Sequence, residues 1–445
     1  MRDPEVERPA TRPLTLAHAT ALVVASMVGT GVFTTTGFML TDLGSPPLVL
    51  GVWVVAGLLA LAGAAVYAEL GAMMPRAGGE YVYLSRAFHP SVGFLSGWIS
   101  LLVGFAAPTA AAALAFGRYL QTLAPAVPVK AAALVLVAAS TALHVRDVRR
   151  GGMAQALLTG LVLALILAFI GAAFVSGRAE WGRLLVATQP RPGLGAVAVS
   201  LVYVAYSYFG WNAAAYVAGE IRDPHRTLPR ALVGGTATVT ILYVALNAVY
   251  MAAAPVAALA GKVEIARVAA VALLGSRGGA VVGALVAVAL AGSVSALCMT
   301  GPRVLQAMAE DGQFFRVLGR TGRGGAPTAA VLLQGALACL GIVTAAFEPL
   351  LVYAGFTLTL SAAATVAGAF VLRRREPGAA RPHRAMGWPA SGMAYLALSA
   401  FMTCFAIRER PTESLAGLGT LLVGALAWLV WTRRRGGPPA NGRRP

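Results

Sequence analysis

The chain of 445 residues is too apolar for a soluble globular protein, because 58% of its residues are hydrophobic and only 12% are charged. Its formal net charge of +18 would suit nucleic acid, but the Lys and Arg residues are scattered between apolar segments and share no basic face, so we expect no nucleic-acid partner. The composition instead indicates a polytopic membrane protein.

Residues 1–15 are polar and include acidic side chains, so we expect a cytoplasmic tail and not a cleaved signal peptide. A membrane-spanning helix needs about 20 mainly apolar residues, and that rule predicts about twelve spans. Barrel strands would alternate in polarity and these segments do not, so the expected fold class is an all-α integral membrane protein. The spans are expected at residues 16–40, 47–73, 92–117, 129–144, 153–175, 196–219, 231–254, 279–301, 328–346, 350–372, 387–407 and 414–432.

The placement of Lys and Arg sets the expected orientation. If the N-terminus is cytoplasmic, 25 of the 35 Lys and Arg residues lie on the cytoplasmic side. Both termini, including a tail at 433–445, are therefore expected in the cytoplasm of a multi-pass cell-membrane protein. The connections are no longer than roughly 25 residues, which leaves no room for a catalytic domain outside the membrane. We therefore expect a protein that is not an enzyme.

The first span carries glycines and hydroxyl side chains where a membrane helix is normally continuous. In the stretch VVASMVGTGVFTTTGF, Gly29 and Gly31 lower the cost of leaving helical geometry, and Ser26 and Thr30 can bond the released backbone groups. Non-helical backbone at membrane depth must be buried in protein or line a cavity. The stretch predicts an interrupted helix, although a helix-packing face of small residues would also account for the motif alone.

The sixth span contains a second interruption. In VYVAYSYFGWNAAAYVAGE, polar and aromatic residues surround a glycine at mid-span. The two interruptions, Gly29–Gly31 and Tyr208–Gly210, lie about 180 residues and five helices apart, as in transporters whose site lies between the broken helices of two inverted repeats. The predicted architecture is a five-plus-five inverted repeat, at residues 16–175 and 196–372, followed by helices 11 and 12 at 387–432.

Charged side chains are scarce within the predicted spans. Of the 17 acidic residues, Glu69 and Glu220 touch the spans, and both lie near expected cytoplasmic ends. A site that selects a cationic substrate by charge would be expected to present a carboxylate. The expected substrate is therefore a zwitterion with a neutral side chain.

Four longer motifs occur in the order seen in a known family. They are MVGTGVF in the first span, YAELGAMMPRAGGEYVYLSRAF after the second, YFGWNAAAYVAGEIRDPHRTLPRAL from the sixth and GPRVLQAMAEDGQF after the eighth. With them the chain resembles, over nearly its whole length, the amino acid, polyamine and organocation (APC) superfamily, specifically bacterial amino acid permeases of the neutral amino acid type. The resemblance implies the LeuT-like fold and secondary transport of an amino acid by alternating access, with no cofactor.

The resemblance also implies a substrate site at the two breaks. In the family, backbone N–H groups of the first break hold the substrate carboxylate, which here matches Ser26–Gly31. The aromatic gate matches Tyr206. The carbonyls that hold the ammonium match Val24, Ala25, Tyr206, Ser207 and Phe209. The complete set assigned to substrate binding is Val24, Ala25, Ser26, Met27, Val28, Gly29, Thr30, Gly31, Tyr206, Ser207, Tyr208, Phe209 and Gly210.

The fifth span departs from the family pattern. Many proton-coupled or exchanging relatives carry a lysine there, at the place where sodium binds in sodium-coupled relatives, whereas alignment through Gln155 and Thr159 puts Val162 at that position. This departure argues against lysine-mediated proton coupling. A candidate ion site remains between helix-one carbonyls and helix-eight hydroxyls, although such hydroxyls commonly bond their own backbone. Its members are Ala25, Val28, Ser293 and Ser295.

The cytoplasmic motifs are expected to serve conformational change. Glu220, followed closely by several arginines, is a candidate inner gate, and the alternative is an interfacial charge that meets water. The turn at Gly78-Gly79 is expected to begin a short interfacial helix that includes Glu80 and Arg86, and Asp311-Gly312 is expected to end another helix.

Few other chemistries are indicated. The three cysteines, Cys298, Cys339 and Cys404, lie in apolar segments, and no histidine clusters with them, so we expect neither a disulfide framework nor a metal site. Animal members of the family join an ancillary glycoprotein through a cysteine between helices three and four, and the corresponding GRYLQTLAPAVPVK has none. The expected partners are therefore the amino acid and the lipid bilayer, without a disulfide-linked ancillary subunit.

Two alternatives to a neutral amino acid permease remain. One is a cationic amino acid or polyamine exchanger of the same superfamily. The other is a membrane enzyme, which would need a nucleophile beside a base, a pair that the spans do not show. The sequence leaves open which amino acid is carried, the direction of flux, the coupling ion (proton, sodium or none) and the oligomeric state.

Overall fold

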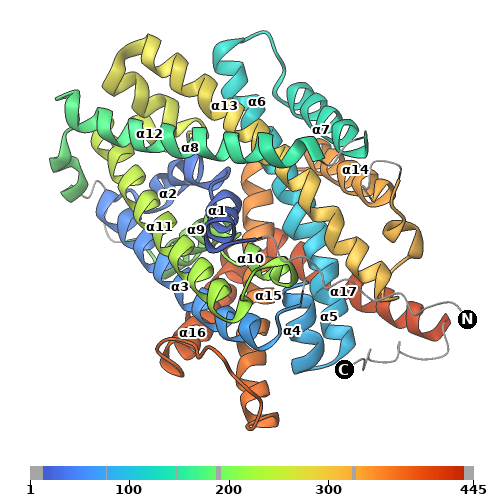
Figure 1. Ribbon diagram of the computed structural model, residues 1–445. Helices are drawn as coiled ribbons and strands as arrows, with labels where there is room; N and C mark the ends of the chain where they lie inside the picture. The colour runs from blue at the N-terminus through green and yellow to red at the C-terminus, as the bar shows by residue number, and fades with distance from the viewer. Residues whose placement is uncertain (1–13, 77, 147–148, 187–191, 323–326, 435–445) are drawn as a thin grey trace, which may run out of the picture.

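The computed structural model describes residues 14–76, 78–146, 149–186, 192–322 and 327–434. Within these ranges every regular element is a helix, apart from one isolated parallel bridge between Leu14 and Ile221 (Figure 1). The expected all-α class is confirmed for this part of the chain.

In the described part of the chain, seven helical stretches are long and apolar enough to cross a bilayer. They are α3 (Pro46–Met73), α5 to α6 (Pro90–Leu123), α11 (Pro224–Ala253), α13 (Ile265–Glu310), α15 (Phe347–Arg375), α16 (Ala390–Glu409) and α17 (Pro411–Arg434). Further apolar helices are α1 (Leu16–Met27), α7 (Val129–Arg146), α8 (Arg149–Val175), α9 (Leu194–Tyr208) and α14 (Thr328–Thr344). Each predicted span contains one of these helices, and the chain is a multi-pass membrane protein.

Both predicted interruptions are present. The first span stops at Met27, makes a 3-10 turn (η1, Gly31–Phe33) and resumes as α2 (Thr35–Leu43). The sixth span stops at Tyr208, where α9 ends, and Gly210 adopts a φ of 109°, a left-handed value that favours glycine. The remainder of the predicted 196–219 span is made of short turns, α10 (Ala213–Tyr216) and η4 (Ala218–Glu220).

The eighth span is longer than predicted. The sequence places its end at residue 301, but α13 continues to Glu310, so most of the motif GPRVLQAMAEDGQF lies inside the helix. Pro302 does not end it, because membrane helices tolerate proline where neighbouring helices pack against the freed backbone. The predicted stop at Asp311-Gly312 is confirmed, with Gly312 at a φ of 71°.

The third span contains a local distortion. Between α5 (Pro90–Ile99) and α6 (Ala107–Leu123), residues Ser100–Ala106 form a π-helical turn (η2). Pro108 at the start of α6 has no N–H to donate to the preceding turn, which accounts for the irregular pairing there. The short helix predicted after the Gly78-Gly79 turn is confirmed as α4 (Glu80–Ala87).

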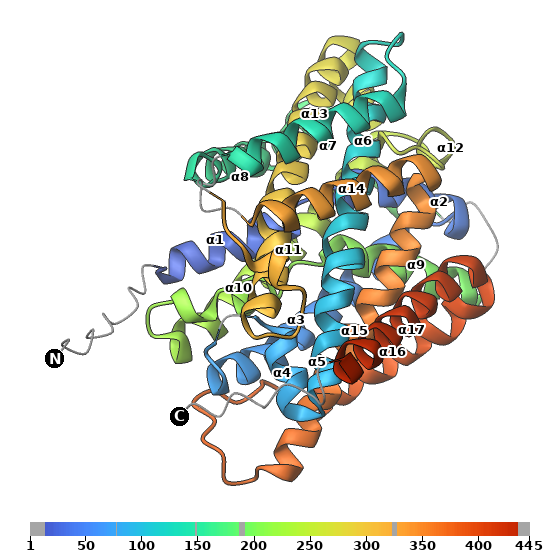
Figure 2. The ribbon, with the colours of Figure 1, turned by 90° about the vertical axis from the view of Figure 1, so that its right-hand side faces the viewer.

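The helices surround the two interrupted segments. Helix α3 packs on both α9 and α11, and α1 lies along α11. Across the molecule α13 packs on α6 and α8, and α7 pairs with α14. Helices α16 and α17 lie together beside α15 (Figure 2). The breaks in the first and sixth spans therefore meet inside a packed helical bundle.

Candidate functional site

The two breaks touch each other. A Cβ atom on Gly31 would overlap the side chain of Ser207, and one on Gly210 would overlap the carbonyl oxygen of Ser26. Only glycine leaves room for such a close backbone approach. The structure thus brings together two predicted segments that lie far apart in the sequence, although neither interruption alone could show that they meet.

The first break leaves backbone donors without a main-chain partner. Among the described residues, no backbone hydrogen bond uses the N–H of Thr30 or Gly31. Both residues are buried. These N–H groups lie at the start of the η1 turn, where unpaired backbone donors can attract an anion.

The predicted ammonium acceptors divide into two groups. The carbonyl of Val24 already accepts the Val28 N–H (2.9 Å), and that of Tyr206 accepts the Phe209 N–H (3.1 Å). In the described part of the chain, no backbone hydrogen bond uses the carbonyls of Ala25, Ser207 or Phe209. The latter three are the stronger candidates for a substrate ammonium group.

Hydroxyl side chains hold the first break in shape. Thr35 donates through Oγ1 to the Gly31 carbonyl (2.9 Å), and Thr34 donates to the Thr30 carbonyl (2.9 Å). The Thr35 hydroxyl also lies 3.2 Å from Ser207 Oγ, which links the two breaks. These bonds satisfy carbonyls that a continuous helix would pair with backbone N–H groups.

Tyr206 and Tyr208 point to different surroundings. Tyr206 is 7% exposed and lies against Thr30 and against Gly355 of α15, next to the free donors. Tyr208 is fully buried, and its hydroxyl donates to the Trp53 carbonyl on α3 at 3.1 Å. The Tyr206 side chain therefore lies beside the unpaired donors, whereas the Tyr208 side chain belongs to the packing behind the break.

Access to the breaks differs between their two sides. Ser26 is exposed, whereas Thr30 and Tyr206 are buried. About one turn before Tyr206 on α9, Tyr203 donates a hydrogen bond to Glu348 (2.6 Å). Arg410 also donates to Glu348 (2.8 Å). Aromatic contacts from α2 to α9 and α15 cover the same side, with ring centroids 6.0 Å apart. These contacts cover the break on the side of Tyr203, whereas the Ser26 side chain beside the break is exposed.

The candidate ion residues do not all face one cavity. A cavity of about 10 Å³, room for about one water molecule, is lined by Ala25, Val28 and Ser293, with Val162 in its wall. Ser295 is not among its lining residues; its hydroxyl lies 2.8 Å from His144 Nε2 on α7. Residues two apart on a helix face different directions, which explains the separation. No cluster of His, Cys, Asp or Glu suited to a metal occurs among the residues that were placed.

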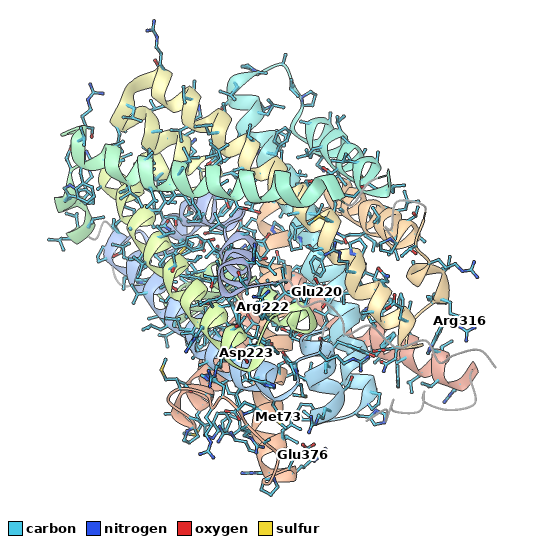
Figure 3. The ribbon with its side chains drawn as sticks, viewed as in Figure 1. Met73, Glu220, Arg222, Asp223, Arg316 and Glu376 are labelled. Atoms are coloured by element: carbon cyan, nitrogen blue, oxygen red, sulfur yellow. The ribbon has the colours of Figure 1, made fainter. Side chains whose placement is uncertain are left out.

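Glu220 is exposed at the end of η4 (Figure 3). Among ion pairs between described residues, none joins it to Arg222, Arg226 or Arg230. Its backbone carbonyl instead accepts the Leu14 N–H at 3.1 Å, and Arg222 N–H donates to the Leu14 carbonyl at 2.9 Å. These two backbone hydrogen bonds hold the segment before α1 to the end of η4. The Glu220 side chain forms none of the predicted ion pairs with these arginines.

One buried carboxylate was not anticipated. Glu80, expected at an interfacial helix, is 3% exposed and accepts hydrogen bonds from Tyr67 (2.6 Å), Ser361 (2.7 Å) and Asn212 (3.0 Å). Burial raises the pKa of the Glu80 carboxyl, and the hydrogen-bond donors partly oppose that rise. Glu80 therefore ties the segment after the second break to α3 and α15.

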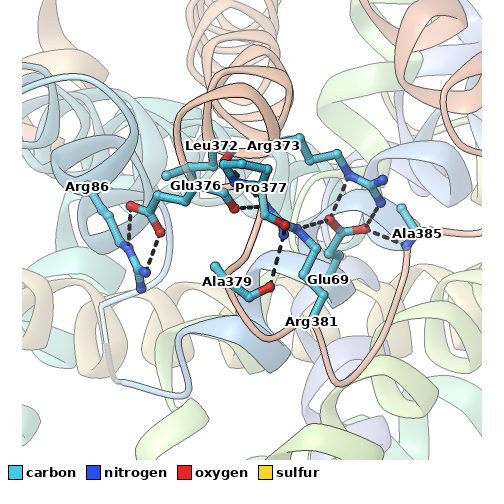
Figure 4. A network of polar contacts seen from close by, with 9 residues as sticks. All are labelled: Glu69, Arg86, Leu372, Arg373, Glu376, Pro377, Ala379, Arg381 and Ala385. Carbon is cyan, nitrogen blue, oxygen red and sulfur yellow. Dashed lines mark hydrogen bonds and ion pairs between the residues drawn. The ribbon is translucent and has the colours of Figure 1, made fainter.

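A second carboxylate joins the ends of α3 and α15. Glu69 is bound by Arg373, whose Nε lies 2.9 Å from Oε1, and by the Ala385 N–H at 2.7 Å (Figure 4). Arg381 approaches the same carboxylate at 3.5 Å. The sequence placed Glu69 near a span end, but only the fold shows that it anchors the loop after α15.

The chain matches known proteins over most of its length. Residues 14–425 match the family model described as amino acid permease. The chain is 31% identical over 428 residues to large neutral amino acids transporter small subunit 2 of Mus musculus, covering 93% of this chain and 80% of the relative. It is 28% identical over 383 residues to b(0,+)-type amino acid transporter 1 of Mus musculus, covering 82% and 77%. It is 26% identical over 436 residues to the cystine/glutamate transporter of Homo sapiens, covering 95% and 86%.

Proposed function

The chain belongs to the amino acid permease family, and from this premise we propose that it is a secondary transporter that carries neutral amino acids across the cell membrane by alternating access. The observation that carries the proposal is the contact between two broken helices whose unpaired main-chain groups lie together without a charged residue in the predicted site. Such a site can bind the two charged groups of a zwitterion, while a neutral side chain needs no counterion. Neither covalent chemistry nor a cofactor is part of the proposal.

The relatives support the substrate class in part. Of the three relatives described above, the one with the highest sequence identity is named for large neutral amino acids. Another relative is named for cystine and glutamate, so members of the family are not confined to neutral substrates. The second candidate is a cationic amino acid or polyamine exchanger of the same superfamily, which the names of these two relatives do not address. The three relatives are mammalian and give no support to the bacterial part of the resemblance.

The proposed architecture has twelve spans. Helices one to five at 16–175 and six to ten at 196–372 would form the inverted repeats, with helices 11 and 12 at 387–432 packed outside them. Two features favour this arrangement: each half begins with a broken helix, and the two breaks touch. The tails at 1–15 and 433–445 would be cytoplasmic, as the Lys and Arg distribution predicts.

The proposed binding mode uses backbone groups for both ends of the substrate. The N–H groups of Thr30 and Gly31 bind the carboxylate, and the carbonyls of Ala25, Ser207 and Phe209 bind the ammonium. Tyr206 closes the site from outside, and the exposed side of Ser26 gives the cytoplasmic route. The described conformation is then the inward-facing one.

Two further assignments remain proposals. The cavity beside Ala25, Val28 and Ser293 is the proposed place for a coupling ion, and Ser295 is left out because it bonds His144. The three cysteines lie in α13, α14 and α16, away from the loop after α6, which is consistent with no disulfide-linked subunit. Glu220 keeps a proposed role at the inner gate through its carbonyl bond to Leu14.

Competition uptake in proteoliposomes tests the substrate class. We expect unlabelled leucine, alanine or serine to reduce uptake of a labelled neutral amino acid, and arginine or putrescine to have little effect. Tyr206→Ala is expected to abolish uptake in protein that remains monodisperse in detergent. Displacement by arginine or putrescine alone would assign the second candidate, and full uptake by Tyr206→Ala would contradict the proposed gate.

A further inference from the structure

Glu80, the first residue of α4, lies at a buried junction of several helices. Its Oε1 atom accepts the hydroxyl of Tyr67 on α3 (2.6 Å) and the Nδ2 amide of Asn212 (3.0 Å). Its Oε2 atom accepts the hydroxyl of Ser361 on α15 at 2.7 Å, and the Ser96 hydroxyl of α5 lies 3.5 Å away. Each carboxylate oxygen therefore faces its own pair of donors, and the pairs come from different parts of the bundle.

No positive charge balances this carboxylate among the residues that the structure places. None of their ion pairs involves Glu80. The titratable side chains that face it from the surrounding helices are tyrosines: Tyr67 on α3, Tyr83 on α4, Tyr216 on α10 and Tyr395 on α16. A buried carboxylate without a counterion depends on its hydrogen-bond donors, so Glu80 and its donors hold one another in place.

The segment after the second break rests on the turn that precedes Glu80. The Gly78 N–H donates to the Tyr216 carbonyl at 3.2 Å. The Trp211 ring lies edge-on to the Tyr67 ring, with centroids 4.6 Å apart. The segment that follows the break is thus docked on α3 and on the turn before α4.

Asn212 belongs to the same turn as the second break. The Ala213 N–H donates to the Gly210 carbonyl at 3.0 Å, which closes a turn that includes Asn212. Phe209, whose carbonyl is a proposed ammonium acceptor, directly precedes this turn. A shift of the Asn212 side chain would therefore be passed to the backbone of the break.

The two sides of the second break have different anchors. On the α9 side, Ser207 Oγ lies 3.2 Å from Thr35 Oγ1 of α2. On the other side, Asn212 is held by Glu80. Loss of the second anchor would change the position of the Phe209 carbonyl relative to that of Ser207.

We propose that Glu80 is a positioning residue for the substrate ammonium group: it holds Asn212 and thereby fixes the Phe209 carbonyl relative to the Ser207 carbonyl. The inference rests on the proposed function, because it needs an amino acid bound between the breaks. Glu80 itself does not touch the substrate. Its contribution depends on an oxygen acceptor for Asn212 and not on the negative charge of the carboxylate.

The test removes the acceptor and then restores it. Glu80→Met has a similar length but no oxygen, and in proteoliposomes it is expected to raise the KM for a neutral amino acid about tenfold, with a much smaller change in maximal rate. Glu80→Gln keeps one oxygen for Asn212 and turns its amide toward Ser361, whose hydroxyl can accept as well as donate. Its KM should therefore stay within about threefold of the wild type.

A competitor without an amino group checks which end of the substrate is affected. In Glu80→Met, inhibition by the free amino acid should weaken as the KM rises. The inhibition constant of the corresponding deaminated acid should change less than about twofold, because that compound has no ammonium group to lose. A general structural defect would weaken both competitors equally.

Tyr83→Phe and Ser361→Ala are the matched controls. Tyr83 is 1% exposed and faces the same carboxylate, but its hydroxyl has no hydrogen-bond partner among the described atoms, so the KM of Tyr83→Phe should match the wild type. Ser361→Ala removes a donor from Oε2 and leaves the Asn212 side intact. It should raise the KM less than about threefold.

A double-mutant cycle tests the route through Asn212. Asn212→Ala should raise the KM about as much as Glu80→Met, and the double variant should be no worse than either single variant, because both remove the same bond. Additive effects would show that Glu80 acts by another route. If Glu80→Met does not fold, Asn212→Ala is compared with Ser361→Ala, and a strong rise in KM is expected for the former alone.

The outcomes separate the two ideas. The role of Glu80 is overturned by an unchanged KM in Glu80→Met or in Asn212→Ala, by additive effects, by equal losses in the Met and Gln variants, or by equal weakening of both competitors. In each of these cases wild-type uptake would still support an amino acid transporter. Absence of amino acid uptake by the wild type overturns the proposed function itself.

Discussion

Gly29 and Gly31 lie two residues apart in the broken first span, yet the space around them differs. The nearest atoms to a Cβ on Gly29 would be 3.9 Å away, whereas a Cβ on Gly31 would overlap Ser207. Gly31→Ala is expected to raise the KM about tenfold or more, because the added Cβ would push Ser207 away and separate the two breaks where the substrate is proposed to bind. Gly29→Ala should stay within about twofold of wild type. KM values from proteoliposome uptake check this, and equal effects of the two substitutions would contradict it.

Local signals made the breaks predictable, and long-range contacts made other residues unpredictable. Glycines with hydroxyl neighbours in an apolar span marked Gly29–Gly31 and Gly210 without knowledge of any partner. The burial of Glu80 depends on Tyr67, Asn212 and Ser361, which come from three different parts of the chain. No sequence window contains them together, so Glu80 was expected at an interface.

The same distinction applies to helix ends and helix faces. Gly301-Pro302 resembles a stop signal, but α13 continues because the surrounding helices support it. Ser293 and Ser295 look equivalent in the sequence, and only the orientation of α13 shows that Ser293 lines the cavity. The order of spans was predictable from hydropathy, whereas their contacts required the fold.

Two Arg–Glu contacts join different helices, and one is much more buried than the other. We therefore predict different losses of stability when each glutamate is replaced. Glu69 is 3% exposed and holds α15 and its following loop to α3, whereas in the Arg86–Glu376 pair the side chains are 42% and 34% exposed. Glu69→Ala should lower the free energy of unfolding by about 3–5 kcal/mol, because it leaves buried arginine charge and the Ala385 N–H unpaired.

Glu376→Ala should cost less than about 1 kcal/mol, as is usual for exposed pairs. The midpoint of thermal unfolding in detergent measures both variants. A similar shift in the two would show that Glu69 does not anchor the loop.

Asp42, beyond the predicted 16–40 span at the end of α2, gives the closed side a predicted pH response. Burial raises the pKa of Asp42 to about 6, Arg410 lowers it and Glu348 raises it further. Because its pKa lies above its ordinary value in this closed conformation, the closed state binds the proton more tightly, and its added stability is lost as pH rises through about 6.

Acidifying the external medium should therefore hold the transporter closed to the outside. With internal pH fixed, uptake is expected to fall as external pH drops through about 6. Asp42→Asn should remove this dependence, and Glu413→Gln, near the same arginine, should retain it. A wild-type uptake rate that stays flat across this range would contradict the prediction.

For the whole molecule, the proposed orientation can be tested at two glycines with open space around them. No atom lies within 4 Å of a Cβ placed on Gly182, in the turn Trp181–Leu185, or on Gly378, after α15. In a background lacking the three native cysteines, Gly182→Cys should react with a membrane-impermeant maleimide in intact cells. Gly378→Cys should react only after permeabilisation, because its loop follows the arginine-rich end of α15. The reverse labelling pattern would invert the topology.

The use of main-chain groups at the breaks also affects how this protein can evolve or be engineered. Every residue except proline carries the same N–H and carbonyl, so most substitutions at Thr30 or Ser207 leave those groups chemically intact. In the proposed binding mode, recognition of the α-amino acid head group is thereby shielded from most single mutations, provided that the glycines stay. Changes in substrate preference must arise in the side chains around the break. A redesign of specificity should therefore substitute those side chains and leave the backbone conformation of the break unchanged.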